Sequence, residues 1–166
     1  MLCIRDVVGA DRPAIISIIE RAGNLTEEER GCALELLDIY LNGGQDKDYF
    51  FVAAAGGDGL PAGYVCYGRA TLTRGTYDIY WILVDPESMG KGIGTALLGH
   101  VEALLKKAGA RLMVAETSGL PSYERARLFY LRCGFREEAR VRDFFNAGDD
   151  KVIYVKDVSD AAIGGR

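Results

Sequence analysis

The sequence predicts an α+β domain built on a central, mostly antiparallel β-sheet, and three features support this prediction. Segments with the branched and aromatic residues of strands are interleaved with segments of helical periodicity. Short turns rich in Gly, Asp and Asn join several of the strand segments, which is typical of hairpins. The 166 residues suit one compact domain, and no repeat or linker divides them. We therefore expect a single domain over residues 1–158, followed by a loose tail over residues 159–166.

The N-terminal part of the chain is predicted to contain one strand followed by two helices. Residues 2–7 (LCIRDV) have the composition of a short strand. We expect Asp11 to cap a helix that carries Pro13 in its first turn and several isoleucines after it. A second helix opens at Thr26, because Glu29 three residues later completes the pattern of a capping box. A Gly-Gly pair ends this helix.

The middle of the chain is predicted to hold three strands and then a helix. Residues 48–57 and 61–72 read as two strands around a Gly- and Asp-rich turn, and residues 75–84 (GTYDIYWILV) as a third. A glycine-rich stretch then leads into a helix. The apolar residues at steps of three and four along this helix, which predict its buried face, are Ile93, Leu97, Val101, Leu104 and Ala108.

The C-terminal part is predicted to form a strand, a helix and a hairpin. Residues 111–117 (RLMVAET) read as a buried strand, and residues 122–134 as a helix that stops at a glycine. Residues 135–145 and 151–158 read as two strands joined by the turn NAGDD.

Composition excludes several classes of protein. The net charge of −4 without a basic cluster disfavours a nucleic-acid surface, and no apolar run approaches the roughly 20 residues of a membrane span. The N-terminus does not have the pattern of a secretory signal, so we expect a cytoplasmic protein. Four scattered cysteines predict reduced, mostly buried thiols rather than a disulfide scaffold or zinc site. With one histidine, His100, we expect neither a metal site nor a serine–histidine triad.

The glycine-rich stretch between the third strand and its helix is the strongest functional signal. Gly90, Gly92 and Gly94 would expose backbone N–H groups at a helix start, where the partial positive charge suits a phosphate or diphosphate. Lys91 could add a cation and Thr95 a hydroxyl. The stretch is not a P-loop, and Thr95 replaces the third glycine of a dinucleotide fingerprint. A tight turn without a ligand remains the alternative.

The same stretch resembles the acetyl-CoA-binding motif of the GCN5-related N-acetyltransferase (GNAT) family. That motif has the form [Gln/Arg]-x-x-Gly-x-[Gly/Ala] after a strand that ends in Val-x-Pro-Glu. Residues 84–87 (VDPE) and 89–94 (MGKGIG) follow this pattern, with Met89 in the place of the Gln or Arg.

A second block, residues 123–135 (YERARLFYLRCGF), is similar to a later motif of the family, Asn-x-x-Ala-x-x-x-Tyr-x-x-x-Gly-Phe. Ala126, Tyr130 and the Gly-Phe pair have the expected spacings, whereas Tyr123 stands where Asn is usual. The resemblance is strongest from about residue 77 to residue 135.

The resemblance implies a fold, a cosubstrate and a set of contacts. The fold is the α/β-sandwich-like GNAT fold, with a mixed, mostly antiparallel seven-stranded sheet flanked by about four helices. The cosubstrate is acetyl-CoA, whose thioester carbonyl would accept a hydrogen bond from a backbone N–H at the end of the strand 75–84. The implied cofactor-binding residues are Ile82, Leu83, Val84, Met89, Gly90, Lys91, Gly92, Ile93, Gly94, Thr95, Tyr123, Ala126 and Tyr130.

The resemblance also suggests catalytic roles. Tyr130 would be the general acid that protonates the departing sulfur, or it would simply pack beneath the cofactor. Glu116 and Asp78 are the candidates for the base that removes the amine proton, directly or through water, and an ordinary solvated or ion-paired acid is the alternative for each.

The acceptor is less defined. Tyr77, Tyr80, Trp81, Phe144 and Phe145 could line an acceptor pocket or belong to the strand core, and the acids of the NAGDD turn could attract a cationic acceptor. We expect transfer to a primary amine of a small metabolite or amino-acid-like acceptor. The alternatives are a protein N-terminus or lysine as acceptor, and a non-catalytic acyl-CoA-binding regulatory domain. A homodimer is left open.

Overall fold

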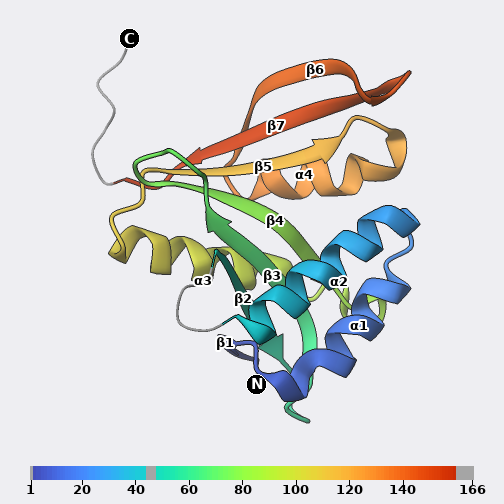
Figure 1. Cartoon of the computed structure of the whole chain (residues 1–166), viewed down its shortest axis with the longest axis vertical. Coiled ribbons are helices and arrows are strands. Elements are labelled where there is room, and N and C mark those ends of the chain that lie inside the picture. The colour runs from blue at the N-terminus through green and yellow to red at the C-terminus, as the bar shows by residue number, and fades with distance from the viewer. Residues whose placement is uncertain (1, 44–47, 160–166) are drawn as a thin grey trace. The chain divides into compact units, whose positions relative to one another are not determined.

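The computed structural model describes residues 2–43 and 48–159 and divides the chain into two compact units. The first unit holds Met1–Gly68 and Ile79–Val101, and the second holds Arg69–Asp78 and Glu102–Arg166. In the described residues the strands follow the order β1-β2-β3-β4-β5-β7-β6 in one seven-stranded sheet, which confirms the predicted α+β class (Figure 1). The predicted tail lies outside the described residues apart from Ser159.

The element bounds agree with the predicted order of strands and helices. The strands are β1 (Cys3–Asp6), β2 (Tyr49–Ala55), β3 (Pro61–Arg69), β4 (Thr76–Val84), β5 (Leu112–Ser118), β6 (Arg136–Asn146) and β7 (Asp149–Asp157). The α-helices are α1 (Arg12–Arg21), α2 (Glu27–Asn42), α3 (Ile93–Lys107) and α4 (Glu124–Arg132). Three short 3-10 helices cover Gly9–Asp11, Pro86–Ser88 and Pro121–Tyr123. No helix of the described residues is long and apolar enough to cross a membrane.

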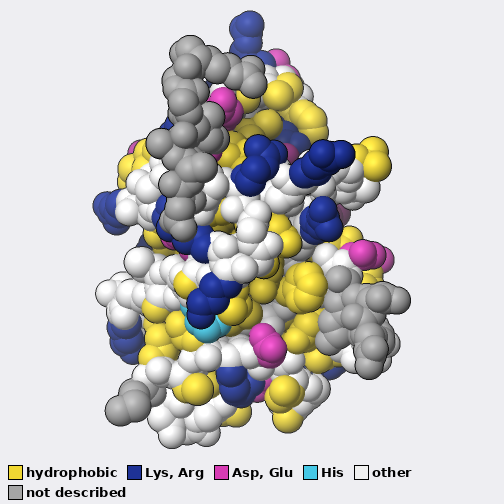
Figure 2. Space-filling model, turned by 90° about the vertical axis from the view of Figure 1, so that its left-hand side faces the viewer, with side chains coloured by type: hydrophobic (Ala, Val, Ile, Leu, Met, Phe, Trp, Pro, Cys, Tyr) yellow, Lys and Arg dark blue, Asp and Glu magenta, His cyan; other side chains and the backbone are white. Residues whose placement is uncertain are grey.

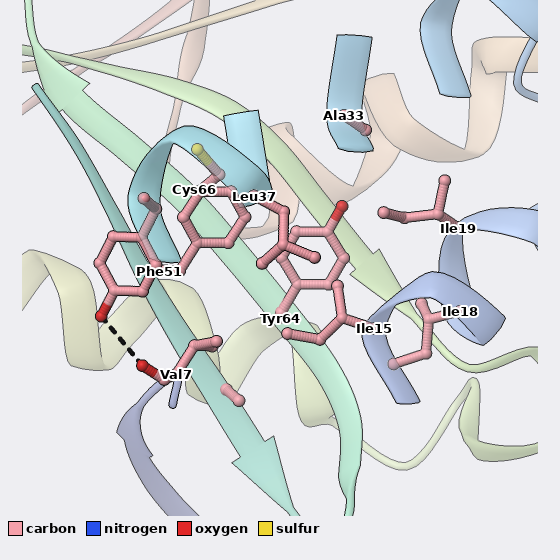
Figure 3. Close-up of a cluster of buried hydrophobic side chains, with 11 residues drawn as sticks. Val7, Ile15, Ile18, Ile19, Ala33, Leu37, Phe51, Tyr64 and Cys66 are labelled. Atoms are coloured by element: carbon pink, nitrogen blue, oxygen red, sulfur yellow. Dashed lines mark hydrogen bonds between the residues drawn. The ribbon is translucent and has the colours of Figure 1, made fainter. Parts of the chain in front are cut away.

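The core of the first unit lies between its helices and its antiparallel strands. β2 pairs with both β1 and β3, and Figure 3 shows side chains of α1 and α2 meeting those of β2 and β3. Tyr64 and Cys66 on β3 are fully buried in this cluster. Successive residues of a strand point to opposite faces, so Gly63 faces the other way. There a Cβ on Gly63 would lie 3.0 Å from the side chain of Ile93, the first residue of α3.

The starts of the first two helices differ from each other. The predicted capping box of α2 is confirmed, because the Thr26 N–H donates to Glu29 (2.7 Å) and the Glu29 N–H donates to the Thr26 hydroxyl (3.2 Å). The predicted cap of α1 is wrong: the Asp11 side chain makes no capping hydrogen bond. Its carboxylate instead accepts from the Val8 N–H (2.9 Å) and pairs with Arg5 at 2.6 Å.

The buried face of α3 is also corrected. Ile93, Leu97 and Val101 are buried as predicted, but Leu104 is 37% exposed and Ala108 lies beyond the end of the helix. Leu98 and Leu105 are buried in their place. Steps of three and four are both compatible with a helix of 3.6 residues per turn, so spacing alone did not determine which neighbour faces inward.

The second unit contains an antiparallel array of three strands. β7 pairs with both β5 and β6. All residues of β6 are exposed, and the ladder is irregular between Val141 and Asn146. β7 begins at Asp149, so the turn is shorter than the predicted NAGDD.

The four cysteines are free thiols. Cys66 is buried and Cys133 partly buried, but Cys3 and Cys32 are exposed. The expectation of mostly buried thiols is therefore wrong.

Candidate functional site

The glycine loop lies in the first unit between β4 and α3. A 3-10 turn follows β4, with the Asp85 carboxylate accepting a hydrogen bond from the Glu87 N–H (2.9 Å). Gly90 and Gly92 then adopt left-handed φ angles of 78° and 77°, which side chains other than glycine rarely adopt. A Cβ added to either glycine would meet nothing within 4 Å, so open space lies in front of this backbone.

Helix α3 starts directly after these two glycines. The Ala96 N–H donates to the Gly92 carbonyl (2.9 Å), so the first turn of the helix begins at the loop itself. The first N–H groups of any α-helix have no acceptor within the helix, and they carry the positive end of its dipole. An anion in the open space would meet N–H groups rather than side chains, which suits a diphosphate.

The side chains of the loop have different environments. Met89, Lys91 and Thr95 are exposed, whereas Ile93 is buried and packs near Gly63. The Lys91 ammonium donates to the Glu87 carbonyl (3.0 Å), which places its charge at the turn before the glycines.

One residue of this region was not predicted from the sequence. Arg21, in the last turn of α1, pairs with Asp85 and, at 3.4 Å, with Glu87. It thereby ties the turn before the glycine loop to α1. A cavity of about 620 Å³ adjoins this place, lined by residues of α1, the β2–β3 turn and the turn at Asp85. No local pattern connects positions 64 residues apart, so the sequence offered no signal for this pair.

The end of β4 leads into the same loop. Ile82, Leu83 and Val84 are only partly buried although all three are apolar. The strand ends where the Asp85 N–H donates to the Ala62 carbonyl of β3 (2.9 Å). This end of the strand therefore keeps apolar surface that a ligand could cover.

Tyr130 lies in the second unit, on α4, with 6% of its surface exposed. Its ring stacks on Tyr154 of β7 at 5.8 Å between centroids and contacts the Phe135 ring at 5.4 Å. Burial raises the pKa of the Tyr130 hydroxyl above the ordinary value of 10, so it is protonated at neutral pH. The hydroxyl makes no hydrogen bond to any described residue and can serve a ligand.

The Gly-Phe pair after α4 explains how Tyr130 is held. Gly134 has a left-handed φ of 86°, which turns the chain back at the helix end. The Phe135 N–H then donates to the Tyr130 carbonyl (3.0 Å), and the Phe135 ring reaches the Tyr130 ring. Ala126, one turn earlier, is partly buried, and Tyr123 ends the 3-10 helix before α4.

The two predicted carboxylates lie within electrostatic reach of each other in the second unit. Burial, and then the charge of Glu116, raise the pKa of Asp78 above its ordinary value of 3.8, while Lys151 opposes this. Glu116 is itself ion-paired, with 2.5 Å between its carboxylate and the Lys151 ammonium. Asp78 has no ion pair to any described residue, so the two acids have different surroundings.

Lys151 was not predicted as part of this group. It stands opposite Ser118 in the β5–β7 ladder, two residues from the position opposite Glu116. Such diagonal neighbours share one face of the sheet and are within reach of long side chains. Lys151 also lies 4.4 Å from the centroid of the Phe144 ring. Only the strand pairing, which the sequence did not give, brings these residues together.

The predicted acceptor aromatics do not form a common core. Phe144 and Phe145 are each 52% exposed, with their rings edge to face at 5.0 Å, and Tyr80 is 38% exposed. The interpretation as strand core is wrong for these three. Tyr77 and Trp81 are partly buried, and Trp81 packs against the core of the first unit.

The acids of the β6–β7 turn are already engaged. The Ser118 hydroxyl donates to Asp149 at 2.5 Å, and Asp150 pairs with Arg140 at 3.5 Å. Residues 2–43 and 48–159 contain no group of three or more His, Cys, Asp or Glu side chains that could hold a metal ion. His100 is partly exposed on α3.

Comparison with known proteins decides the family. The acetyltransferase (GNAT) domain matches residues 46–137, a segment that includes the glycine loop, Asp78, Glu116 and Tyr130. The chain belongs to the GNAT acetyltransferase family. A crystal structure assigned to this family, from Desulfovibrio desulfuricans, is 42% identical with a TM-score of 0.90, over 95% of this chain and 99% of that one.

More distant structures share the GNAT fold alone. The ribosomal-protein-S18-alanine N-acetyltransferase from Escherichia coli is 21% identical, with a TM-score of 0.76 over 100% of this chain and 99% of that one. An aminoglycoside 6'-N-acetyltransferase complexed with coenzyme A is 12% identical, with a TM-score of 0.71 over 94% and 97%.

Two curated relatives are longer than the region they share with this chain. Both are uncharacterized N-acetyltransferases from Methanocaldococcus jannaschii, 35% and 32% identical. The matches cover 59% and 64% of this chain but only 43% and 65% of the relatives, which is less than two thirds of either.

Proposed function

We propose that this GNAT chain transfers an acetyl group from acetyl-CoA to a primary amine of a small metabolite or amino-acid-like acceptor. The observation that carries the proposal is the pair of left-handed glycines, Gly90 and Gly92, facing open space at the start of α3. Membership of an acyl-CoA-dependent acetyltransferase family, and a fold neighbour solved with coenzyme A, support the same assignment. The backbone N–H groups of residues 90–95 would hold the diphosphate, with Lys91 nearby.

In the proposed reaction the amine nitrogen attacks the thioester carbonyl, the C–S bond breaks and an amide forms. A backbone N–H within residues 82–84 would donate to the carbonyl oxygen as negative charge develops there. Tyr130 would donate its proton to the departing sulfur, and its protonated state at neutral pH supports this role. The acceptor amine loses its proton to a base, since alkyl ammonium groups are mostly protonated at pH 7.

Asp78 is the better candidate for that base. Its pKa is raised, which makes it a stronger base than an ordinary carboxylate, and no described residue forms an ion pair with it. The carboxylate of Glu116 is held by Lys151 instead. We propose that Glu116 raises the basicity of Asp78 through its charge rather than by taking the proton itself.

Asp78→Asn is expected to lower kcat/KM by roughly a hundredfold, because the amide cannot accept the amine proton. The activity of the unmodified chain should fall as the pH drops through the raised pKa of Asp78, and the variant should lack this limb. Glu116→Gln should lose less activity than Asp78→Asn. It should also shift the fall in activity to lower pH, because the charge of Glu116 no longer raises the pKa of Asp78. The pH profile of thiol release gives the activity and its pH dependence for each variant. Equal losses of activity in Asp78→Asn and Glu116→Gln, with pH profiles like that of the unmodified chain, would contradict the assignment of Asp78 as the base.

A stability measurement separates this effect from unfolding. Because the folded pKa of Asp78 exceeds its unfolded value, the protonated form is the stabilising one, and stability is lost as the pH rises through the folded pKa. Asp78→Asn should therefore raise the Tm at neutral pH and leave it unchanged well below pH 3.8. A lower Tm at neutral pH would assign the activity loss to a damaged fold.

The test of the proposed function is release of coenzyme A thiol from acetyl-CoA over a panel of small amines, amino acids and peptides. Acceleration by small primary amines supports the proposal, and acceleration by peptides alone would favour a protein acceptor. The fold neighbours include enzymes named for a ribosomal protein and for an aminoglycoside, so the fold accommodates both acceptor classes. A rise in Tm with coenzyme A but no thiol release with any acceptor would favour a binding domain.

Other expectations from the sequence stay predictions. They are the single domain over residues 1–158, the cytoplasmic location, the absence of a nucleic-acid partner and a homodimer.

A further inference from the structure

A second cavity lies in the second unit, where β4 begins and α3 ends. Its volume is about 550 Å³, which falls within the range of small-molecule pockets. Three arginines, Arg69, Arg74 and Arg111, line it together with Tyr77 and three small residues. No acidic side chain contributes to the lining. The cavity is therefore open, of ligand size and positively charged.

The charges of these three arginines are not neutralised by any described residue. Arg69 donates to the Thr73 carbonyl (3.3 Å) and Arg111 to the Arg74 carbonyl (2.8 Å), and both acceptors are uncharged. The Arg74 side chain has no partner in the described part of the chain. Arginines that do pair with carboxylates are Arg5, Arg12, Arg21, Arg136 and Arg140.

The three unpaired arginines lie together although the net charge of the chain is −4. Figure 2 shows one face of the molecule, on which several dark-blue Lys and Arg side chains lie near one another. Three like charges around one cavity repel one another, and a bound anion would relieve this repulsion.

The backbone holds the wall of the cavity in place. Gly75 has a left-handed φ of 83°, and its carbonyl accepts hydrogen bonds from Arg111 N–H (2.7 Å) and Leu112 N–H (3.1 Å). The Arg111 carbonyl in turn accepts from the Val158 N–H (2.9 Å). Since the Nε of Arg111 is bound to the Arg74 carbonyl, its guanidinium is oriented while both Nη groups are left for a ligand. Donors fixed in advance lose little entropy on binding.

We propose that this cavity binds a small anion that carries a phosphate or a carboxylate group. The planar guanidinium matches both groups with two parallel hydrogen bonds, and Tyr77 also lines the cavity. The glycine loop directly precedes the first residue of α3, whereas the cavity is lined by residues just after its last, Ala108, Gly109 and Arg111, and by residues before and within β4. The two share no residue and are different sites. The inference does not depend on the acetyltransferase reaction.

Titration calorimetry with inorganic phosphate, and separately with citrate, tests the proposal on the full chain saturated with coenzyme A. Coenzyme A keeps phosphate from the glycine loop, and the two probes distinguish the two anion classes. Arg74→Ala is expected to weaken binding of the preferred probe at least about tenfold, because the variant loses one fork of charged hydrogen bonds. Arg74→Lys keeps the charge but not the two parallel hydrogen bonds, so its affinity for the probe should lie between those of the unmodified chain and Arg74→Ala.

Arg142→Ala is the matched control, because Arg142 is exposed on β6 and does not line the cavity. It should bind the probe with unchanged affinity. Arg69→Ala is a second cavity variant that should weaken binding independently, which guards against a local fold defect in Arg74→Ala. The proposal is overturned if neither probe binds, or if the cavity variants and Arg142→Ala bind equally well. The comparison among variants holds even if coenzyme A does not bind.

Discussion

Replacing Tyr130 by Phe is expected to lower kcat by roughly a hundredfold, while the affinity for coenzyme A changes by less than about twofold. The change removes only the hydroxyl that would protonate the sulfur. The ring keeps its stacking on Tyr154 and its contact with Phe135, so the local packing is retained. Steady-state thiol release gives kcat, and titration calorimetry gives the affinity.

Tyr154→Phe is the control for this prediction. Tyr154 is also buried, stacks on the same ring and loses the same single oxygen. Its variant should keep the kcat of the unmodified chain. Full activity in Tyr130→Phe would show that the hydroxyl is dispensable and that Tyr130 only packs. Equal losses in both variants would point to disturbed packing rather than lost proton donation.

The second large effect is expected at the glycine loop: Gly92→Val should weaken coenzyme A binding at least about a hundredfold. A β-branched residue at a φ of 77° is strained by on the order of 1–3 kcal/mol, and its side chain would fill the open space that the anion needs. The N–H groups would then be both displaced and covered. Calorimetry with coenzyme A, and the rise in Tm on adding it, measure the loss.

Gly99→Val serves as the comparison on the same helix. A Cβ at Gly99 also meets nothing within 4 Å, but Gly99 is not among the glycines with left-handed φ. Its affinity for coenzyme A should stay within about twofold, with a small change in Tm from helix propensity. A Gly92→Val chain that folds and binds as tightly as the unmodified chain would remove the loop from the cofactor site.

Local patterns predicted most of the fold because they act over a few residues. Thr26 and Glu29 predict a helix start because their capping-box hydrogen bonds span only three positions, and the structure confirms both bonds. Asp11 also precedes a helix in the sequence, but its carboxylate forms an ion pair with Arg5 of β1 instead of capping the helix. A competing ion pair of this kind is not visible in the pattern around Asp11.

In the candidate site, too, the sequence predicted the features that depend on neighbouring residues but not those that depend on contacts between elements. Glycine spacing identified the loop, because left-handed φ angles and close approach require this residue type. The spacing could not reveal Arg21 or Lys151, whose partners lie on other elements of their units. The arginine cavity was missed for the same reason, since Arg69 and Arg111 come together only through the turn at Gly75.

Gly63 lies beside the residue with which α3 begins, next to the glycine loop proposed to bind the cosubstrate. The missing side chain lets Ile93 pack against β3, because a Cβ at Gly63 would lie 3.0 Å from the Ile93 side chain and 3.0 Å from the Leu83 carbonyl oxygen. Ile93 is buried and is the first residue of α3, so its contact with β3 fixes the end of the helix that adjoins the glycine loop. If this loop holds the cosubstrate as proposed, a larger residue at Gly63 would weaken its binding from the interior, although Gly63 itself would not contact the ligand.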